Sequence, residues 1–398
     1  MYIKTNIKIK NLKDFRKKIL ERGKMKKIGI VVGKFFPLHI GHVNLIQRAS
    51  GIVEKLYVVV SYSTDGDDLI TSNSRFVKEI TPKDRLRFVK QTFKNQPNIV
   101  SFLFNEDDCP PYPDGWEKWS KLLKDEIEKR ENRENEERKK NKKNLDWEND
   151  VIFISNHKDD KKYYLKYFGS QTKSIDENYN EYNVNSHEIR ENPSKYWNYL
   201  PREVREHLIP IITICGGESS GKSVMIDKLA NVFNTSSAWE YGREYVFEKL
   251  GGDEDALQYS DYEKIVFGHQ SNVLYAARNA NKFALIDTDY ITTLAFCLTY
   301  EERDNPIVRE FVQNYRFDLT ILLENNVKWV NDGLRSIGDD DRREKFQKLL
   351  KKLYKEYNIS YVTVKSNSYE NRYLACKHII KAYLNGEENL QEIADSYE

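Results

Sequence analysis

The chain has 398 residues, of which 39% are hydrophobic and 32% are charged. This length predicts two or three domains, and the composition excludes both a single small module and wholesale disorder. Lys and Arg number 64 against 62 Asp and Glu, a formal net charge of +2, so no global field draws the chain to nucleic acid or to an anionic membrane.

The cysteines and the apolar stretches indicate the cellular compartment of the protein. The four cysteines are scattered without disulfide or zinc-ligand spacing, which favours a reducing cytosol; they are Cys109, Cys215, Cys297 and Cys376. The longest apolar stretches, such as 56–60 and 208–214, fall far short of the roughly 20 residues that a membrane span needs. Residues 1–24 contain no apolar block typical of a secretory signal. We therefore expect a cytoplasmic protein without membrane insertion.

Short β-branched runs alternate with longer helical stretches in the first half of the chain. The expected strands are 27–33, 56–63, 98–104 and 151–155. Parallel strands that are buried on both faces read as continuous apolar runs, and their crossovers need helices. Residues 25–191 are therefore predicted to form a doubly wound α/β domain with a parallel sheet, preceded by an N-terminal extension, 1–24.

The same rhythm restarts in the second half. Strands are expected at 209–215, 283–289, 319–324 and 359–365, which predicts a second doubly wound parallel sheet over residues 209–390. Residues 192–208 contain two prolines, an aromatic cluster and a short charged helix. This composition predicts a packed connector rather than a floppy linker.

One charged segment, residues 124–144, stands apart because Ile127 is its only apolar residue. Such a composition predicts a solvated helix extension or surface loop that cannot bury a core face, and so a tolerated insertion. Its acidic and basic residues nearly cancel, which argues against a nucleic-acid arm that binds through counterion release.

The strand at 27–33 runs directly into the turn GKFFPLHIGH and then into a helix. Gly33 and Gly41 would let a phosphate chain approach the backbone, and the helix N-terminus favours an anion. His39 and His42 can stabilise charge that accumulates at phosphorus during transfer. The HxGH word resembles the signature of the nucleotidyltransferase superfamily, whose members move an adenylyl or cytidylyl group. The nucleotide-binding residues expected in this turn are Gly33, Lys34, Phe35, Phe36, His39, Gly41 and His42.

The strand at 209–215 is followed by GGESSGKS and a helix, which is a phosphate loop in its required context. Backbone N–H groups would hold the β- and γ-phosphates of ATP or GTP, Lys222 would neutralise them, and the Ser223 hydroxyl would bind Mg²⁺. The ATP-binding residues expected here are Gly217, Glu218, Ser219, Ser220, Gly221, Lys222 and Ser223.

Acidic and basic residues near other strand ends complete this second site. Asp287 is expected to hold the magnesium ion together with Ser223. Glu240 would take the proton of an acceptor hydroxyl that Arg243 positions, and Asp289 competes for that role as base. A polar stretch, 332–346, would close over the phosphoryl group as a lid, or is a solvated loop; its arginines are Arg335, Arg342 and Arg343.

The two motifs together imply that a hydroxyl is phosphorylated and that the new phosphate is then adenylylated. Over residues 25–385, in words such as GGESSGKSV, TSSAWEYGREYVFEKLGGDE and IDTDYITTLAFC, the chain resembles the bifunctional NadR family, which joins a nicotinamide-nucleotide adenylyltransferase to a ribosylnicotinamide kinase. The resemblance implies ATP, nicotinamide riboside, nicotinamide mononucleotide (NMN) and NAD as the small-molecule ligands.

The resemblance also implies site residues. Trp116 and Trp119 would give the cationic nicotinamide ring of NMN an aromatic face, and Arg190 would serve the adenylyltransferase nucleotide site. The residues implied for the riboside are Trp239, Glu240, Arg243, Tyr262 and Asp289, with Trp329 and Asp332 as further candidates.

The chain departs from the family at several points. A family word close to SxTKIR reads NSHEIR, with His187 and Glu188 in place of Thr and Lys, and an SSEP-like segment reads ISNHKDD. These changes leave open a kinase whose first half is only a nucleotide sensor; an enzyme like coenzyme A synthase is the other alternative. The extension 1–24 is too short for the helix-turn-helix repressor domain of some family members, so no DNA binding is expected. The oligomeric state stays open.

Overall fold

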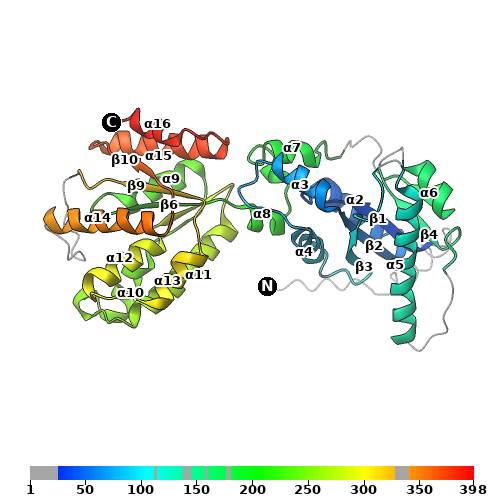
Figure 1. The fold of residues 1–398 in the computed structure, drawn as a ribbon, viewed down its shortest axis with the longest axis horizontal. Coiled ribbons are helices and arrows are strands. Elements are labelled where there is room, and N and C mark those ends of the chain that lie inside the picture. The colour runs from blue at the N-terminus through cyan, green and yellow to red at the C-terminus, as the bar shows by residue number, and fades with distance from the viewer. Residues whose placement is uncertain (1–25, 112–113, 138–144, 157–159, 176–180, 328–339) are drawn as a thin grey trace, which may run out of the picture. The chain divides into compact units, whose positions relative to one another are not determined.

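The computed structural model describes residues 26–111, 114–137, 145–156, 160–175, 181–327 and 340–398. The chain divides into two compact units, Met1–Val204 and Arg205–Glu398. Each unit is built around one five-stranded sheet in which every pair of neighbouring strands is parallel (Figure 1). The expected α/β class with two parallel sheets is therefore confirmed.

The first sheet has the strand order β3-β2-β1-β4-β5. Its strands are β1 (Lys26–Gly33), β2 (Val53–Tyr62), β3 (Ile99–Asn105), β4 (Val151–Ile154) and β5 (Gln171–Lys173). The central strands are apolar runs because helices cover both faces, and Ile30 and Val59, for example, are fully buried. The sequence analysis did not expect β5, because this three-residue edge strand reads QTK and carries no apolar signature.

The helices of the first unit lie between these strands and after the last one. They are α2 (Ile40–Ser50), α3 (Thr64–Ser72), α4 (Pro82–Thr92), α5 (Trp116–Glu137), α6 (Lys161–Phe168), α7 (Ser186–Glu191) and α8 (Arg202–Leu208), with a 3₁₀ turn at Trp197–Tyr199. The boundary between the units falls within α8.

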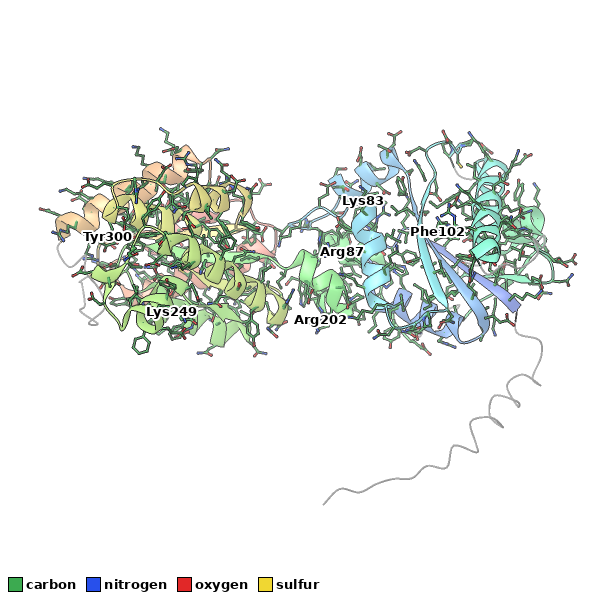
Figure 2. All side chains as sticks on the ribbon, turned by 90° about the horizontal axis from the view of Figure 1, so that it is seen from below. Lys83, Arg87, Phe102, Arg202, Lys249 and Tyr300 are labelled. Carbon is green, nitrogen blue, oxygen red and sulfur yellow. The ribbon has the colours of Figure 1, made fainter. Side chains whose placement is uncertain are left out.

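The charged segment that starts at residue 124 continues α5 as a helix as far as Glu137. Contrary to the expectation, this part does bury a core face, because Leu123 and Ile127 pack into the core of the sheet. The guanidinium of Arg130 lies 4.0 Å from the ring centroid of Phe102 on β3, which Figure 2 labels. Trp116, Trp119 and Leu122 of the same helix also pack against this core, so apolar residues near its start dock an otherwise highly charged helix. Residues 138–144 lie outside the described part.

The second sheet has the strand order β10-β9-β6-β8-β7. Its strands are β6 (Ile211–Gly216), β7 (Ser237–Ala238), β8 (Ala284–Asp287), β9 (Leu319–Leu323) and β10 (Val362–Val364). Figure 1 shows α15 and α16 on one side of this sheet and α11 to α13 on the other. Two apolar cores accordingly fill the two faces of the sheet.

The helices described in the second unit connect its strands and follow the last one. They are α9 (Lys222–Phe233), α10 (Tyr241–Leu250), α11 (Asp261–Asn279), α12 (Tyr290–Tyr300), α13 (Pro306–Asn314), α14 (Asp340–Glu356), α15 (Tyr369–Leu384) and α16 (Leu390–Asp395), with a 3₁₀ turn at Glu254–Ala256. Of the helices that the structure describes, none is long and apolar enough to cross a membrane. All four cysteines are free.

Candidate functional site

The turn between β1 and α2 brings its two histidines into contact. The rings of His39 and His42 are stacked, with centroids 3.6 Å apart and planes at 26°. His39 precedes the first residue of α2 and is only 5% exposed. Burial lowers its pKa to about 4, so the imidazole is neutral at pH 7. Its Nδ1 is buried and has no hydrogen-bond partner among the residues that the structure describes, which leaves it available to a ligand at the helix N-terminus.

Both histidines line a cavity of about 400 Å³. The cavity brings together every residue that the sequence analysis assigned to the adenylyltransferase nucleotide site: Gly33, Lys34, Phe35, Phe36, His39, Gly41, His42 and Arg190. Gly41 packs closely here, because a Cβ atom at its position would lie 3.1 Å from the His39 ring and would press on that ring. Arg190 reaches the turn from α7, and its Nη1 donates to the Phe36 carbonyl at 2.6 Å.

The structure explains the unusual word NSHEIR. Asn185 caps α7, because the Glu188 amide donates to Asn185 Oδ1 at 2.9 Å and the Asn185 amide donates to Glu188 Oε2 at 3.3 Å. The His187 side chain is 70% exposed and lies 3.5 Å from Glu191. Arg190 lines the cavity, whereas His187 and Glu188 do not. The two substituted residues therefore serve the helix and its surface, and the cation that lines the cavity is retained.

A fully buried arginine donates hydrogen bonds to the main chain of this turn. Arg85 on α4 donates to the carbonyls of Lys34 at 2.8 Å and Ser61 at 3.1 Å and pairs with Asp67. Asp67 also lies 3.0 Å from the Lys34 ammonium group. Arg85 could not be singled out from the sequence, because nothing there separates it from Lys83 and Arg87, which are exposed on the same helix (Figure 2).

A second cavity of about 540 Å³ shares Val32 and Lys34 with the first. Trp116 and Trp119 both line it. Trp119 Nε1 donates to Glu106 Oε1 at 2.8 Å, and Trp116 stacks on Tyr163 with centroids 4.8 Å apart. Burial raises the pKa of Glu106. The acidic residues of the lining, which the sequence analysis did not single out, are Asp65, Glu106, Asp107 and Asp160. Aromatic rings beside carboxylates suit a cationic ring.

In the second unit, the phosphate loop joins the central strand β6 to α9. Gly221 precedes the helix with φ of +88°, which a side chain would disfavour. The Lys222 ammonium group donates to the Gly217 carbonyl at 3.2 Å. The loop residues that line a cavity of about 120 Å³ are Glu218, Ser219, Ser220, Gly221, Lys222 and Ser223. Gly217 does not line this cavity, and its N–H donates to Gln347 Oε1 at 3.2 Å.

A second fully buried arginine supports the phosphate loop. Arg372 on α15 donates to the carbonyls of Ser220 at 2.8 Å, Ser366 at 2.6 Å and Glu324 at 2.6 Å. The sequence analysis missed Arg372 and Gln347, because both lie far from the loop in the sequence and neither belongs to a motif. Only the folded chain brings them to the loop.

The two residues proposed for magnesium lie together. The Ser223 hydroxyl makes a hydrogen bond with the buried carboxylate of Asp287. Burial raises the pKa of Asp287, and the Lys222 charge opposes this rise. A hydroxyl and a carboxylate are hard oxygen ligands that fit Mg²⁺. Among the described residues, no cluster of three or more His, Cys, Asp or Glu could hold a metal by itself, so phosphate oxygens and water would supply the other ligands.

Three of the residues expected to bind the riboside line the same cavity as the phosphate loop; they are Glu240, Arg243 and Tyr262. Tyr300 at the end of α12 (Figure 2) and His269, which the sequence analysis did not single out, join them. Trp239 is 60% exposed and is not part of the lining.

Asp289, the rival of Glu240 for the role of base, is placed differently. Its buried carboxylate accepts bonds from the Thr292 amide at 2.9 Å and from the Tyr354 hydroxyl at 2.8 Å, so it caps α12. It does not line the cavity. Because its oxygens already have protein donors, the geometry favours Glu240 as the carboxylate that meets the acceptor hydroxyl.

The expected lid is only partly described. Arg342 is exposed on α14, and the buried Arg343 donates from Nη2 to the Val327 carbonyl at 3.3 Å. Neither lines the cavity of the phosphate loop. Trp329, Asp332 and Arg335 lie outside the described residues.

Comparison with known proteins covers both units. Residues 211–372 match the family model of an AAA domain. The trifunctional NAD biosynthesis/regulator protein NadR of Salmonella typhimurium is 45% identical over 358 residues, which are 90% of this chain and 83% of that protein. The Escherichia coli protein of the same name is 44% identical over 356 residues, 89% and 83% of the two chains. A crystal structure of a NadR protein in complex with NR is 24% identical, and the match covers 91% of this chain and 97% of that one. Its TM-score of 0.72 shows that the two chains share a fold. Since these curated relatives are 44–45% identical to the chain over about nine-tenths of its length, and the chain covers 83% of each of them, the chain belongs to the NadR family.

Proposed function

We propose that the chain is a bifunctional NAD salvage enzyme. Its second unit, about residues 209–390, phosphorylates nicotinamide riboside with ATP to give NMN; its first unit, about residues 25–191, adenylylates NMN with ATP to give NAD and pyrophosphate. The observation that carries this proposal is the 45% identity to a NadR protein over 90% of the chain. The two separate phosphate-binding cavities, one in each unit, support it.

In the kinase reaction, the 5′-hydroxyl oxygen of the riboside attacks the γ-phosphorus of ATP, and the bond from that phosphorus to the bridging oxygen of ADP breaks. Glu240 takes the hydroxyl proton, and Arg243 positions the acceptor. Lys222 stabilises the charge on the phosphoryl group. Ser223 and Asp287 would hold Mg²⁺, which neutralises phosphate charge when it is bound.

In the adenylyltransferase reaction, a phosphate oxygen of NMN attacks the α-phosphorus of ATP, and pyrophosphate leaves. The attacking oxygen is already ionised, so no base is needed. Because it attacks the α-phosphorus directly, no covalent enzyme intermediate forms. His39, His42 and Arg190 stabilise the charge on the five-coordinate phosphorus. Trp116 and Trp119 give the nicotinamide ring its aromatic surface, and the carboxylates beside them favour its positive charge.

Two other functions remain as rivals. The word NSHEIR suggests the first rival, a kinase whose first unit only senses nucleotide. The positions of His187 and Glu188 outside the cavity argue against this function. An enzyme like coenzyme A synthase would also pair the two motifs, and membership of the NadR family speaks against that. We propose that the enzyme works in the cytosol on small molecules and does not bind DNA.

A time course with mass-resolved products tests the proposal. Nicotinamide riboside and ATP should give NMN and ADP first and then NAD and pyrophosphate, and chelation of Mg²⁺ should stop the kinase reaction. If NMN accumulates without NAD, the first unit is a sensor. If phosphopantetheine is adenylylated instead, the enzyme resembles coenzyme A synthase. If no substrate turns over, the enzymatic proposal is wrong.

A further inference from the structure

His269 on α11 is a buried titratable residue that the reactions above do not use. It lines the cavity of the phosphate loop together with Glu240 and Tyr262, and it is only 3% exposed. Its exposure therefore comes from the cavity side, where the acceptor substrate of the kinase would lie.

The surroundings of His269 fix the position of its proton. Nε2 lies 3.3 Å from the Thr288 carbonyl oxygen. A carbonyl oxygen can only accept, so Nε2 carries the hydrogen. Burial lowers the pKa of His269 to about 4, so at neutral pH the ring has no second proton and Nδ1 carries a lone pair.

The partner carbonyl and the ring are held in place. The Thr288 carbonyl oxygen lies 3.0 Å from Thr213 Oγ1, and the Thr288 amide donates to the Ile214 carbonyl at 3.2 Å. The imidazole packs edge-on against the Tyr290 ring, with centroids 5.6 Å apart. Since these contacts fix the ring, they also fix the direction in which Nδ1 points.

Two polar groups on this face of α11 are available to a ligand. Among the described residues, none donates a hydrogen bond to His269 Nδ1. Tyr262, seven residues earlier and therefore on the same face of the helix, has a buried hydroxyl that likewise lacks a partner among the described residues. Buried polar groups without partners destabilise a protein unless a ligand satisfies them.

We propose that His269 is a specificity-determining residue of the kinase site, whose Nδ1 accepts a hydrogen bond from the 2′- or 3′-hydroxyl of the acceptor ribose. The proposal rests on the proposed kinase function. Thr288, which His269 contacts, lines the cavity and directly follows Asp287 in the chain, so the proposal places His269 near the groups that would handle the phosphoryl group. The ribose, and not the nicotinamide ring, is the part of the substrate that must lie near these groups.

The test compares wild type with three variants of the full-length chain: His269→Phe, His269→Gln and His269→Asn. Phe removes both nitrogens, Gln keeps a donor for the Thr288 carbonyl, and Asn keeps an acceptor near the place of Nδ1. Each protein is given nicotinamide riboside and its 2′-deoxy and 3′-deoxy analogues. KM and kcat are measured for all three, and calorimetry gives the dissociation constants.

We expect His269→Phe and His269→Gln to weaken binding of nicotinamide riboside about tenfold, mainly through KM, and His269→Asn to lose much less. With one of the two deoxy analogues, the same Phe and Gln substitutions should change little, because the hydroxyl that His269 reads is already absent. His378→Phe is the matched control, since His378 is exposed on α15 and outside the cavity.

An equal loss with all three substrates would overturn the proposal, and so would a Gln variant that binds like wild type. If the Phe variant fails to fold, the Gln and Asn variants decide the matter. If wild type binds the riboside but does not phosphorylate it, the proposed function fails, while the dissociation constants still test the role of His269.

Discussion

The two turns that we propose bind phosphate occupy the same place in their sheets but present different groups. Each follows the central strand of a parallel five-stranded sheet, β1 or β6, and leads into a helix. The first presents side chains, the stacked rings of His39 and His42 and the guanidinium of Arg190. The second presents loop residues that end in Lys222 and Ser223. The topology of the sheet therefore gives the two proposed phosphate sites the same position, and the sequence of each turn decides which groups it presents there.

The support behind the two turns is similar. A fully buried arginine donates to main-chain carbonyls of each turn, Arg85 to Lys34 and Arg372 to Ser220. Arg85 also pairs with the carboxylate of Asp67, whereas Arg372 also donates to the side-chain oxygen of Asn326. A turn that presents amides or side chains to an anion leaves its carbonyls facing the protein, and a buried guanidinium satisfies several of them at once.

The largest effect that separates the two sites is expected from Lys222→Ala. It should lower riboside phosphorylation about 10³-fold, because the charge on the transferring phosphoryl group loses its side-chain cation. Adenylylation of NMN should not change. Lys228→Ala, an exposed lysine on the same helix, is the control. Separate assays with riboside and with NMN measure both rates, and loss of both in a folded protein would contradict independent sites.

His42→Ala is the reciprocal change. It should lower NAD formation from NMN about 10²- to 10³-fold, since one group that stabilises charge at the α-phosphorus is removed. Phosphorylation of the riboside should continue. His187→Ala, which changes an exposed histidine of the same unit, should leave both rates unchanged. A large effect of His187→Ala would mean that NSHEIR takes part in adenylylation after all.

A pair of substitutions sharpens the assignment of the kinase base. Glu240→Gln should lower kcat for the riboside about 10²-fold, because the hydroxyl proton loses its acceptor. Asp289→Ala should instead remove the cap of α12 and lower the stability of the second unit by about 1 kcal/mol. Rates per folded molecule and unfolding curves separate the two outcomes. The reverse pattern would give the role of base to Asp289.

Arg85→Met tests the support behind the histidine-bearing turn. It should destabilise the first unit by about 3 kcal/mol, since Asp67 loses a buried partner and two carbonyls lose their donor. Hydrogen exchange measured peptide by peptide should become faster in the first unit and should stay unchanged in the second. Arg87→Met, at the exposed neighbour on α4 (Figure 2), is the control and should change exchange in neither unit.

A more gradual effect is expected from the pH dependence that His39 gives to the stability of the first unit. Its pKa is about 4 in the folded chain against 6.5 as the ordinary value. The unfolded chain binds more protons between these values, so stability falls as pH is lowered through this window. From pH 7 to pH 5 the loss should be about 2 kcal/mol. His39→Gln should remove that share of the slope, again measured by hydrogen exchange, and an unchanged slope would contradict a neutral His39.

The sequence by itself determined the α/β class, the two parallel sheets and the two turns that we propose bind phosphate. Apolar runs such as 27–33 and words such as GGESSGKS are local, and the physics that makes a strand or an anion-binding turn acts over a few neighbouring residues. For the same reason the sequence missed β5, whose polar residues give no local signal.

Only the tertiary structure decided which polar residues are buried and which carboxylate meets a substrate. Arg85 and Arg87 look alike in the sequence, yet one supports a turn and the other faces solvent. Asp289 and Glu240 both follow strands, yet the Tyr354 hydroxyl binds Asp289 from 65 residues away. Burial and pairing depend on contacts between segments far apart in the chain, and a local pattern of residues contains no information about such contacts.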